Sequence, residues 1–372
     1  MLEVRLGQQG PIPLDVSLTC AAGEMLALVG PSGSGKTSVL RAIAGLLKVA
    51  EGRVSLDDVV WFDAERGLDL PTERRPVGMV FQHYALFPHL SALDNIRLAV
   101  PQPRDAAARM EAARKLLQDM QLDGLAARRP HELSGGQRQR VALARALARQ
   151  PKVLLLDEAF SAVDQPTRQA LYDELIGLRE RLSLPIVMVT HDVREARLLA
   201  DRLSIIERGS TLQEGPPERV MSRPRNARVA ALVGLRDIHA GVFLNQGGAR
   251  LRWGESEGAE AIELRVVDKG RIEHGTPVRW VIGGEYVQLH AEPPPNAGAA
   301  NLVPCELARL SRLGEVTTVV CRVATSPAAV LHLEVTTRLA RQLGLAAGQR
   351  ACLQLDPLGI HIMPLRPSRQ PA

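Results

Sequence analysis

The segment from Gly30 to Thr37 constrains this chain most strongly, because its sequence G-P-S-G-S-G-K-T lies between an apolar run and a helical pattern. The run at 25–29 indicates a buried strand, and 38–46 has the composition of a helix. Glycines in such a turn free backbone N–H groups to surround a phosphate, and the helix dipole adds positive potential. The motif therefore predicts a phosphate-binding loop in an α/β fold.

The last residues of the loop indicate a nucleotide with a bound metal ion. Lys36 is expected to reach the β and γ phosphates, and the Thr37 hydroxyl to bind a magnesium ion between them. The alternative, a chance glycine turn before a helix, is disfavoured by the position between strand and helix. We predict that the nucleotide contacts the loop and the serine after it, namely Gly30, Pro31, Ser32, Gly33, Ser34, Gly35, Lys36, Thr37 and Ser38.

Length and composition indicate more than one globular domain. The chain has 372 residues, 45% of them hydrophobic, which is enough for two or three domains. No apolar run approaches the roughly 20 residues that cross a bilayer, and the N-terminus lacks the pattern of a secretory signal. We therefore expect the protein to act in the cytoplasm. Its 4 cysteines are scattered without a C-x-x-C pair, so neither a structural zinc site nor a disulfide framework is predicted.

The charge balance gives little support for a nucleic-acid partner. Lys and Arg outnumber Asp and Glu by 46 to 41, which would suit nucleic acid or an anionic membrane surface. However, the arginines are spread along the helices, and aromatic residues make up only 3% of the chain, too few for a base-stacking surface. We therefore expect no nucleic-acid partner.

Three further apolar strands are predicted to end in polar residues. They are 77–81 before Gln82, 153–156 before Asp157 and Glu158, and 186–189 before Thr190 and His191. Because parallel strands end at one edge of a sheet, these groups are expected to converge. Asp157 would hold magnesium through water, and Glu158 would polarise the water that attacks the γ phosphate. Taken alone, Gln82 is equally explained as a loop residue and His191 as a structural histidine.

Two other segments indicate contacts. S-G-G-Q at 134–137 opens a predicted helix, and unpaired N–H groups there would favour an anion, although Ser134 is also explained as an ordinary N-cap. The segment 83–90 combines Tyr84, Leu86 and Phe87 with Pro88 and His89. A loop would not easily hide so many large groups, so this segment predicts a docking surface.

Taken in order, the motifs resemble those of the ATP-binding subunits of ABC transporters over about residues 1–235. The resemblance is carried by G-P-S-G-S-G-K-T as Walker A, Gln82 as the Q-loop, L-S-G-G-Q at 133–137 as the signature, L-L-L-D-E as Walker B, S-A-V-D at 161–164 as the D-loop and His191 as the switch histidine. Motifs in this order are far more specific than any one of them.

The resemblance implies a head-to-tail homodimer that encloses two ATP molecules, each between Walker A of one subunit and the signature of the other. Ser134, Gly135, Gly136 and Gln137 would contact the ATP held by Lys36 of the partner subunit, so that ATP closes the dimer and hydrolysis reopens it. The resemblance assigns catalysis to Glu158, His191, Gln82 and Asp164, and magnesium binding to Thr37, Gln82 and Asp157.

The resemblance also implies a place in the cell. Integral membrane permease subunits would dock at Gln82 to His89, with a periplasmic or extracellular solute-binding protein acting indirectly. The chain would then be a peripheral subunit on the cytoplasmic face of the membrane.

Two positions depart from the family pattern. No Phe, Tyr or Trp occurs before Trp61, so adenine lacks the usual aromatic partner ahead of Walker A. Ala159 follows Glu158, where the family usually has proline. Neither departure removes a catalytic group, and both concern base recognition or local geometry.

Beyond about Leu235 the sequence predicts a second, β-rich domain. Short β-like runs lie at 241–244, 261–267, 278–282, 287–290, 308–310, 316–323, 330–335, 351–355 and 359–363, with a proline-rich linker at 291–300. Such spacing predicts a small, OB-like barrel. It resembles the TOBE-type regulatory domains of importer ATPases, most closely the molybdate and sulfate branch. Ser311, Arg312, Thr317 and Thr318 are candidate oxyanion ligands, and a purely structural dimerisation module is the alternative.

The sequence thus predicts an α/β P-loop ATPase domain at 1–235 and a small all-β domain at 236–372, in a subunit that energises import of an oxyanion such as molybdate or sulfate. Import of ferric iron, polyamine or sugar is an alternative. A soluble ABC-type ATPase acting on nucleic acid or ribosomes is disfavoured by the single nucleotide-binding domain and the absence of a long coiled-coil insertion. A module that senses ATP without hydrolysis is disfavoured because it needs no general base such as Glu158.

Overall fold

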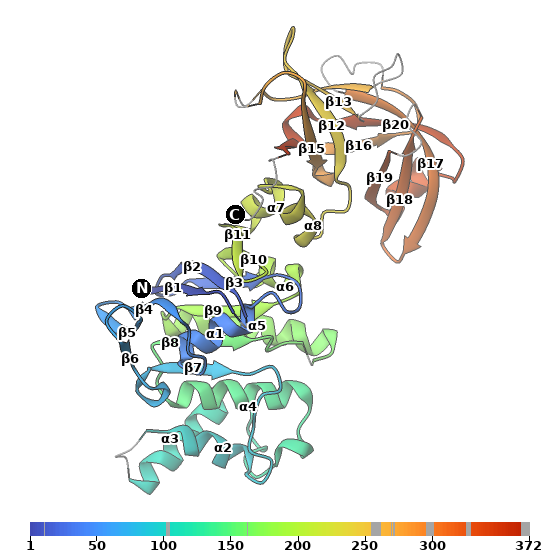
Figure 1. The fold of residues 1–372 in the computed structure, drawn as a ribbon. Coiled ribbons are helices and arrows are strands. Elements are labelled where there is room, and N and C mark those ends of the chain that lie inside the picture. The colour runs from blue at the N-terminus through green and yellow to red at the C-terminus, as the bar shows by residue number, and fades with distance from the viewer. Residues whose placement is uncertain are drawn as a thin grey trace. The chain divides into compact units, whose positions relative to one another are not determined.

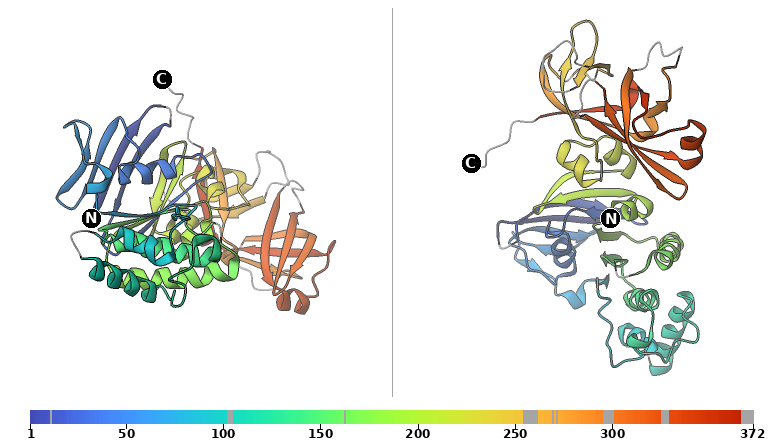
Figure 2. Two further views of the ribbon diagram at one scale, coloured as in Figure 1. Left: turned by 90° about the horizontal axis from the view of Figure 1, so that it is seen from below. Right: turned by 90° about the vertical axis from the view of Figure 1, so that its right-hand side faces the viewer.

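The structure is a computed structural model that describes residues 1–10, 12–101, 105–161, 163–253, 262–268, 270, 272–294, 301–324 and 329–365. Ala162 of the D-loop, Ala261 and residues 295–300 of the predicted linker lie outside these ranges. The chain divides into two compact units, Met1–Glu218 and Arg219–Ala372, which are described separately (Figures 1 and 2). No helix within the described ranges combines the length and apolarity that a membrane span requires.

The first unit is an α/β domain around one mixed sheet with the strand order β6-β5-β4-β1-β2-β11-β10-β3-β9-β8-β7. Its elements are β1 (Leu2–Gln8), β2 (Leu14–Cys20), β3 (Met25–Val29), α1 (Lys36–Ala44), β4 (Glu51–Leu56), β5 (Val59–Asp63), β6 (Leu68–Asp69), β7 (Val77–Val80), α2 (Ala92–Ala99), α3 (Ala106–Asp119), α4 (Gly135–Ala148), β8 (Val153–Asp157), α5 (Gln165–Leu182), β9 (Ile186–Thr190), α6 (Val193–Leu199), β10 (Arg202–Glu207) and β11 (Ser210–Gly215). The predicted P-loop α/β fold is confirmed.

Strands β3, β9, β8 and β7 run parallel to one another. Every residue of β3, β8 and β9 is buried, which explains why these strands are continuously apolar rather than alternating. Because the four strands point the same way, the loops that follow them meet at one edge of the sheet. The predicted convergence of the strand-end residues is therefore confirmed.

The remaining strands and helices of the first unit lie around these four parallel strands. On β1 and β2, buried and exposed residues alternate, as in a sheet covered on one face. Strands β4 and β5 form an antiparallel hairpin, and its turn has Asp57 at a positive φ. Helices α2, α3 and α4 pack together, with α4 against β7 (Figures 1 and 2). The segment between β7 and α2 therefore lies beside α4.

The second unit consists mainly of two antiparallel sheets, with the strand orders β14-β13-β12-β15-β21 and β16-β20-β17-β18-β19. Its elements, with α7 at the boundary, are α7 (Pro217–Ser222), α8 (Ala227–Leu232), β12 (His239–Leu244), β13 (Arg250–Trp253), β14 (Ile262–Arg265), β15 (Thr276–Ile282), β16 (Val287–His290), β17 (Asn301–Leu313), β18 (Val316–Val323), β19 (Val330–Thr336), α9 (Thr337–Gln342), β20 (Arg350–Leu355) and β21 (Ile360–Pro364). The small β domain is confirmed.

The architecture of this unit differs from the predicted barrel. The inward faces of both sheets share one apolar core that includes Phe243, Trp280 and Leu353. No ladder joins the two sheets within the described residues, so each keeps two edge strands instead of closing into a barrel. The side chain of Asn301 connects them, because it bonds the backbone of Arg265 in one sheet and of Leu355 in the other.

The boundary of the second unit lies earlier than the predicted residue 236. Ala230 of α8 packs with Val281 of β15 and Met363 of β21, and Nε2 of His361 donates a hydrogen bond to the carbonyl oxygen of Pro224 at 2.9 Å. Since these contacts join 219–235 to the β strands, the structure groups that segment with the second unit.

The four candidate oxyanion ligands of this unit do not form one site. Ser311 lies opposite Thr318, and Arg312 lies opposite Thr317. Neighbouring residues of a strand point to opposite faces, so the two pairs lie on different faces of the sheet. In addition, Thr317 is buried and its hydroxyl contacts that of Thr337 at 3.1 Å. This prediction is therefore wrong for the four residues as a set.

Candidate nucleotide-binding site

The loop between β3 and α1 depends on glycine at three positions. Gly33 and Gly35 have φ values of +77° and +96°, which favour glycine. At Gly30 a Cβ atom would lie 2.0 Å from the carbonyl oxygen of Ile206, which leaves no room for a side chain. The sequence therefore folds into a tight loop directly before the first turn of α1.

Lys36 begins α1 and turns its side chain back into this loop. Its Nζ donates to the carbonyl oxygens of Gly30 and Pro31, each at 2.9 Å. The side chain is buried, and this burial lowers the pKa of Lys36, while Glu158 and Asp157 oppose the shift. A charged ammonium is therefore held inside the loop, where it can bind an anion.

A pocket of about 460 Å³ opens in front of the loop. It is lined by Ile12, Ser32, Gly33, Ser34, Gly35, Lys36, Thr37, Ser38, Gln82 and Glu158. Most of the residues predicted from Walker A thus surround one cavity, together with Gln82 and Glu158. The apolar Ile12 was not predicted. It belongs to the segment before β2 that holds no aromatic residue.

Asp157 is paired with Thr37, which lines the pocket. The Thr37 hydroxyl donates to Oδ1 of Asp157 at 2.7 Å. Burial raises the pKa of Asp157, while the bond from Thr37 and the charge of Arg41 oppose this. A hydroxyl and a carboxylate side by side are oxygen ligands of the kind that Mg²⁺ prefers.

Glu158 is the centre of the convergent polar groups. Its Oε2 accepts a hydrogen bond from Nε2 of Gln82 at 3.2 Å and lies 3.3 Å from Nδ1 of His191. Glu158 has a φ of +45°, which is uncommon outside glycine, and its amide donates to the carbonyl of Val189 at 3.0 Å. The turn after β8 therefore aims this carboxylate at the groups that follow β7 and β9.

The signature segment lies at the start of α4. Ser134 and Gln137 form a reciprocal capping box, in which each side chain accepts from the other residue's amide. A Cβ atom at Gly136 would lie 2.5 Å from a methyl carbon of Thr167, so any side chain here would displace Thr167. Among the residues that the structure describes, Ser134 to Gln137 are not part of the pocket lining.

Asp164 begins α5 and has a local structural role. Its carboxylate accepts from the amide and the hydroxyl of Thr167, at 3.3 Å and 2.9 Å, as an N-cap does. These bonds lower the pKa of Asp164. Its predicted catalytic role stays a prediction.

Sequence reasoning missed Glu195, a buried carboxyl group next to the His191 turn. It bonds the hydroxyl of Thr190, and that hydroxyl oxygen accepts from the amide of Asp192 at 3.0 Å. Glu195 therefore supports the turn that carries His191. Burial raises its pKa to about 7, with Asp192 adding to the shift and the Thr190 hydrogen bond, Arg168 and His191 opposing it. Thr190 lies five residues before Glu195 and outside α6, so no helical spacing in the sequence indicated this contact.

Replacing Glu195 with glutamine is expected to change how stability depends on pH. In the folded protein Glu195 stays protonated up to pH about 7, whereas in the unfolded chain it ionises near 4.5. Wild-type stability relative to E195Q is therefore greatest below pH 4.5 and falls as the pH rises to 7. We expect a relative loss of up to about 3 kcal/mol between pH 5 and pH 8, measured by urea unfolding. An equal difference between the two proteins at both pH values would contradict the buried, protonated state.

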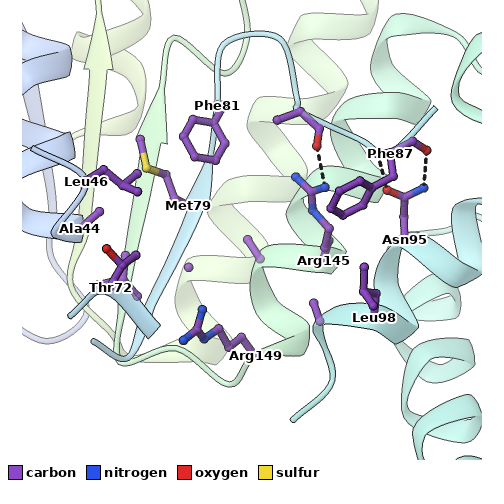
Figure 3. A pocket seen from close by; sticks show the side chains of 15 residues that line it. Ala44, Leu46, Thr72, Met79, Phe81, Phe87, Asn95, Leu98, Arg145 and Arg149 are labelled. Atoms are coloured by element: carbon purple, nitrogen blue, oxygen red, sulfur yellow. Dashed lines mark hydrogen bonds between the residues drawn. The ribbon is translucent and has the colours of Figure 1, made fainter. Parts of the chain in front are cut away.

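A second cavity, the apolar groove, lies beside β7 and α4 and has a volume of about 390 Å³ (Figure 3). It is lined by Ala44, Leu46, Thr72, Val77, Gly78, Met79, Phe81, Ala85, Phe87, Asn95, Leu98, Ala99, Arg145, Ala146 and Arg149. The predicted docking segment 83–90 contributes Ala85 and Phe87, but Tyr84 is buried and offers no surface, contrary to the prediction. The other walls come from residues outside 83–90 and were not predicted.

Comparison with known proteins connects these sites to one family. Residues 14–161 match the family model described as "ABC transporter". The chain is 44% identical over 246 residues to the sulfate/thiosulfate import ATP-binding protein CysA 2 of Agrobacterium fabrum, covering 65% of this chain and 70% of that protein. It is 38% identical to the spermidine/putrescine import ATP-binding protein PotA 1 of Pseudomonas aeruginosa, covering 93% and 90%. It is 37% identical to the sulfate/thiosulfate import ATP-binding protein CysA of Burkholderia pseudomallei, covering 98% of each.

Solved structures resemble the chain over more than half its length. The ATP-binding cassette MJ0796, in a dimeric post-hydrolysis state bound to ADP and Pi, has a TM-score of 0.50 and 31% identity, covering 58% of this chain and 99% of that one. CbiO1 of Clostridium perfringens, part of the ABC transporter complex cbiONQ, has a TM-score of 0.53 and 26% identity, covering 59% and 89%.

Proposed function

The chain belongs to the ATP-binding subunits of ABC importers, which hydrolyse ATP, and from this premise we propose how its residues divide that work. The loop 30–38 holds the phosphates of ATP, with the Lys36 ammonium on the β and γ phosphates. The support is the buried position of Lys36 within a glycine loop in front of a pocket. The apolar Ile12 lies in the same pocket and is the side chain available to cover the base.

We propose that Thr37 and Asp157 bind Mg²⁺ together with the ATP phosphates. Their direct hydrogen bond of 2.7 Å places two oxygen donors side by side at the foot of the loop. Gln82 has its amide nitrogen on Glu158, so its amide oxygen is left for the ion or its water. When bound, the ion would neutralise charge that develops on the phosphates.

The observation that carries the catalytic proposal is the contact of one Glu158 oxygen with both Gln82 and His191. Glu158 accepts the proton of the attacking water, Gln82 orients the carboxylate and the water, and His191 stabilises the charge beside the γ phosphate. All three follow parallel strands of one sheet, so this geometry is fixed by the sheet rather than by flexible loops.

We propose that Ser134 to Gln137 complete the site of a second copy of the chain. The support is their position at a capped helix start, where the amide N–H groups of Gly135 and Gly136 lie outside the capping box, and outside the pocket of their own chain. The dimeric state of the MJ0796 cassette supports a similar pair. Asp164 at the start of α5 would lie at the same contact.

We propose that a permease subunit inserts an apolar helix into the groove beside Phe87. The groove is lined by the segment after Gln82 and by residues of α2 and α4 (Figure 3). A partner bound there would contact this segment, and Gln82 just before it donates a hydrogen bond to Glu158. An amphipathic helix in such a groove is a common mode of recognition. The chain would then be a peripheral subunit on the cytoplasmic face of the membrane.

Replacing Leu98 with aspartate tests this docking. Leu98 lines the groove and is 56% exposed, so a charge there is tolerated in the folded chain but opposes an apolar partner. We expect permease recovery with the affinity-tagged chain to fall at least about tenfold, a free-energy change of about 1.4 kcal/mol. The control is Leu198→Asp, since Leu198 is 50% exposed on α6, outside the groove. Equal losses with both variants would contradict the docking site.

We propose a sulfate-type oxyanion as the imported solute. The support is the similarity to two sulfate/thiosulfate import proteins, one of which is matched over 98% of its length. A polyamine is the second candidate, because the PotA 1 protein is matched over 90% of its length. Molybdate, which the sequence also indicated, is not named among the relatives described above.

Purification of the chain from its own cells in mild detergent tests the function. We expect a multi-span permease to co-purify, and its solute-binding protein to bind sulfate or thiosulfate when titrated. Binding of spermidine instead would favour the polyamine candidate, and recovery of ribosomes or DNA without a membrane protein would overturn the importer proposal.

A further inference from the structure

We infer that Arg145 is a positioning residue through which a permease bound in the apolar groove acts on the signature end of α4. The inference rests on the proposed function, because it requires a partner in that groove. It concerns a residue outside the sequence motifs described above, on the same helix as Ser134 to Gln137.

Arg145 binds the segment that follows Gln82. Its two terminal nitrogens donate to the carbonyl oxygens of Ala85 at 2.7 Å and Tyr84 at 2.9 Å, the first of which is drawn in Figure 3. The same guanidinium lies 5.8 Å from the ring centroid of Phe87, within the range of a cation–π interaction. One side chain of α4 therefore contacts three residues of the segment that follows Gln82.

The bound backbone is strained. Tyr84 and Ala85 have φ values of +60° and +47°, and neither is glycine. A residue other than glycine is disfavoured in the left-handed region and persists there only where its surroundings hold it. The two carbonyls that accept from Arg145 belong to these same residues, so Arg145 is placed to hold the strained conformation.

The charge of Arg145 reinforces this role. Within the described residues no carboxylate pairs with it, and burial lowers the pKa of Arg145. Its guanidinium therefore depends on the carbonyls of Tyr84 and Ala85 for hydrogen bonds. Lysine would keep the charge, but its shorter side chain carries a single ammonium in place of the planar fork whose two terminal nitrogens each reach one carbonyl.

The segment held by Arg145 has three separate attachments. Gln82 at its start bonds the catalytic Glu158. Phe87 at its end is bonded through its amide and carbonyl by the side chain of Asn95 on α2 (Figure 3). Between them Arg145 connects to α4, whose other end is the signature. A displacement of this segment would therefore move Gln82 relative to the Glu158 carboxylate and would also pull on α4, the helix that begins at the signature.

Helix α4 can carry such a shift as a rigid body. It runs without a break from Gly135 to Ala148, with Val141, Ala142 and Ala144 buried along its length. Arg145 is 11 residues after Ser134, so the two ends are about 16 Å apart at 1.5 Å per residue. A helix packed in this way transmits a displacement over that distance instead of bending.

The first test uses amide hydrogen exchange in the isolated subunit. In R145K we expect exchange in residues 83–88 to rise by at least about tenfold, because the guanidinium fork that bonds both strained residues at once is lost. The matched control is R140K, since Arg140 on the same helix pairs with Glu174 of α5 at 3.0 Å and not with this segment. Unchanged exchange in R145K would show that Arg145 does not hold the segment and would overturn the inference.

The second test measures ATP hydrolysis by the purified subunit and by its complex with the permease. We expect R145K to retain the permease and the KM for ATP but to lower stimulation by the permease at least about tenfold relative to R140K. Equal stimulation in the two variants would overturn the inference, and so would loss of the permease from R145K alone, since Arg145 would then only shape the groove. If the wild-type chain itself recovers no permease, the proposed function fails instead, and the inference with it.

Discussion

Replacing Glu158 with glutamine is expected to stop ATP turnover while ATP still binds. The amide keeps the size of the side chain and its contact with Gln82, but it cannot accept a proton from the attacking water. A general base contributes about 100-fold to 10,000-fold to a rate, so kcat should fall at least about 100-fold. ATP should then hold the chain as a dimer, which size-exclusion chromatography with ATP and magnesium detects.

The control for this variant is Glu180→Gln, which removes an exposed carboxylate of α5 at a distance from the pocket. It should match wild type in turnover and in ATP-dependent dimerisation. Hydrolysis by E158Q within a few-fold of wild type would remove Glu158 from the role of base and direct attention to His191.

Replacing Lys36 with alanine is expected to abolish ATP binding at ordinary nucleotide concentrations. The ammonium is buried within the loop and faces the space in front of α1. Each charged hydrogen bond to a phosphate contributes about 1.5–3 kcal/mol, so the Kd for ATP should rise at least about 100-fold. Equilibrium titration with a fluorescent ATP analogue measures this change.

Lys48→Ala is the matched control, because Lys48 is an exposed lysine shortly after α1 and does not line the pocket. Its nucleotide affinity should equal that of wild type. The same affinity in K36A would contradict the assignment of the phosphate-binding loop, whereas lost affinity in both variants would point to a general effect of charge.

Much of the nucleotide site could be predicted because its determinants are local in sequence. Gly33, Gly35 and Lys36 are consecutive or nearly so, and glycine at positive φ followed by a helix start needs no distant contact to be recognised. The apolar runs before Gln82, Asp157 and His191 predicted parallel strands, and parallel strands align their ends whatever the rest of the chain does.

The second unit shows where local patterns were insufficient. Strand β13 was missed because Arg250 and Arg252 alternate with the buried Leu251 and Trp253, which gives a short run little apolar character. The predicted oxyanion set failed because adjacency in sequence placed Arg312 and Thr317 on a different face from Ser311 and Thr318.

The sequence by itself determined the family motifs, the α/β fold and the glycine loop 30–38 that we propose holds phosphate, because these follow from short-range backbone preference and from apolar strand runs. Only the tertiary structure decided that Arg145 of α4 reaches the carbonyls of Tyr84 and Ala85, and that Glu195 is buried beside Thr190. It also decided that the apolar groove takes walls from α1, β7, α2 and α4. Such contacts depend on how separate helices and strands pack, and an arginine or glutamate on a helix has the same local pattern whether it faces water or a buried carbonyl.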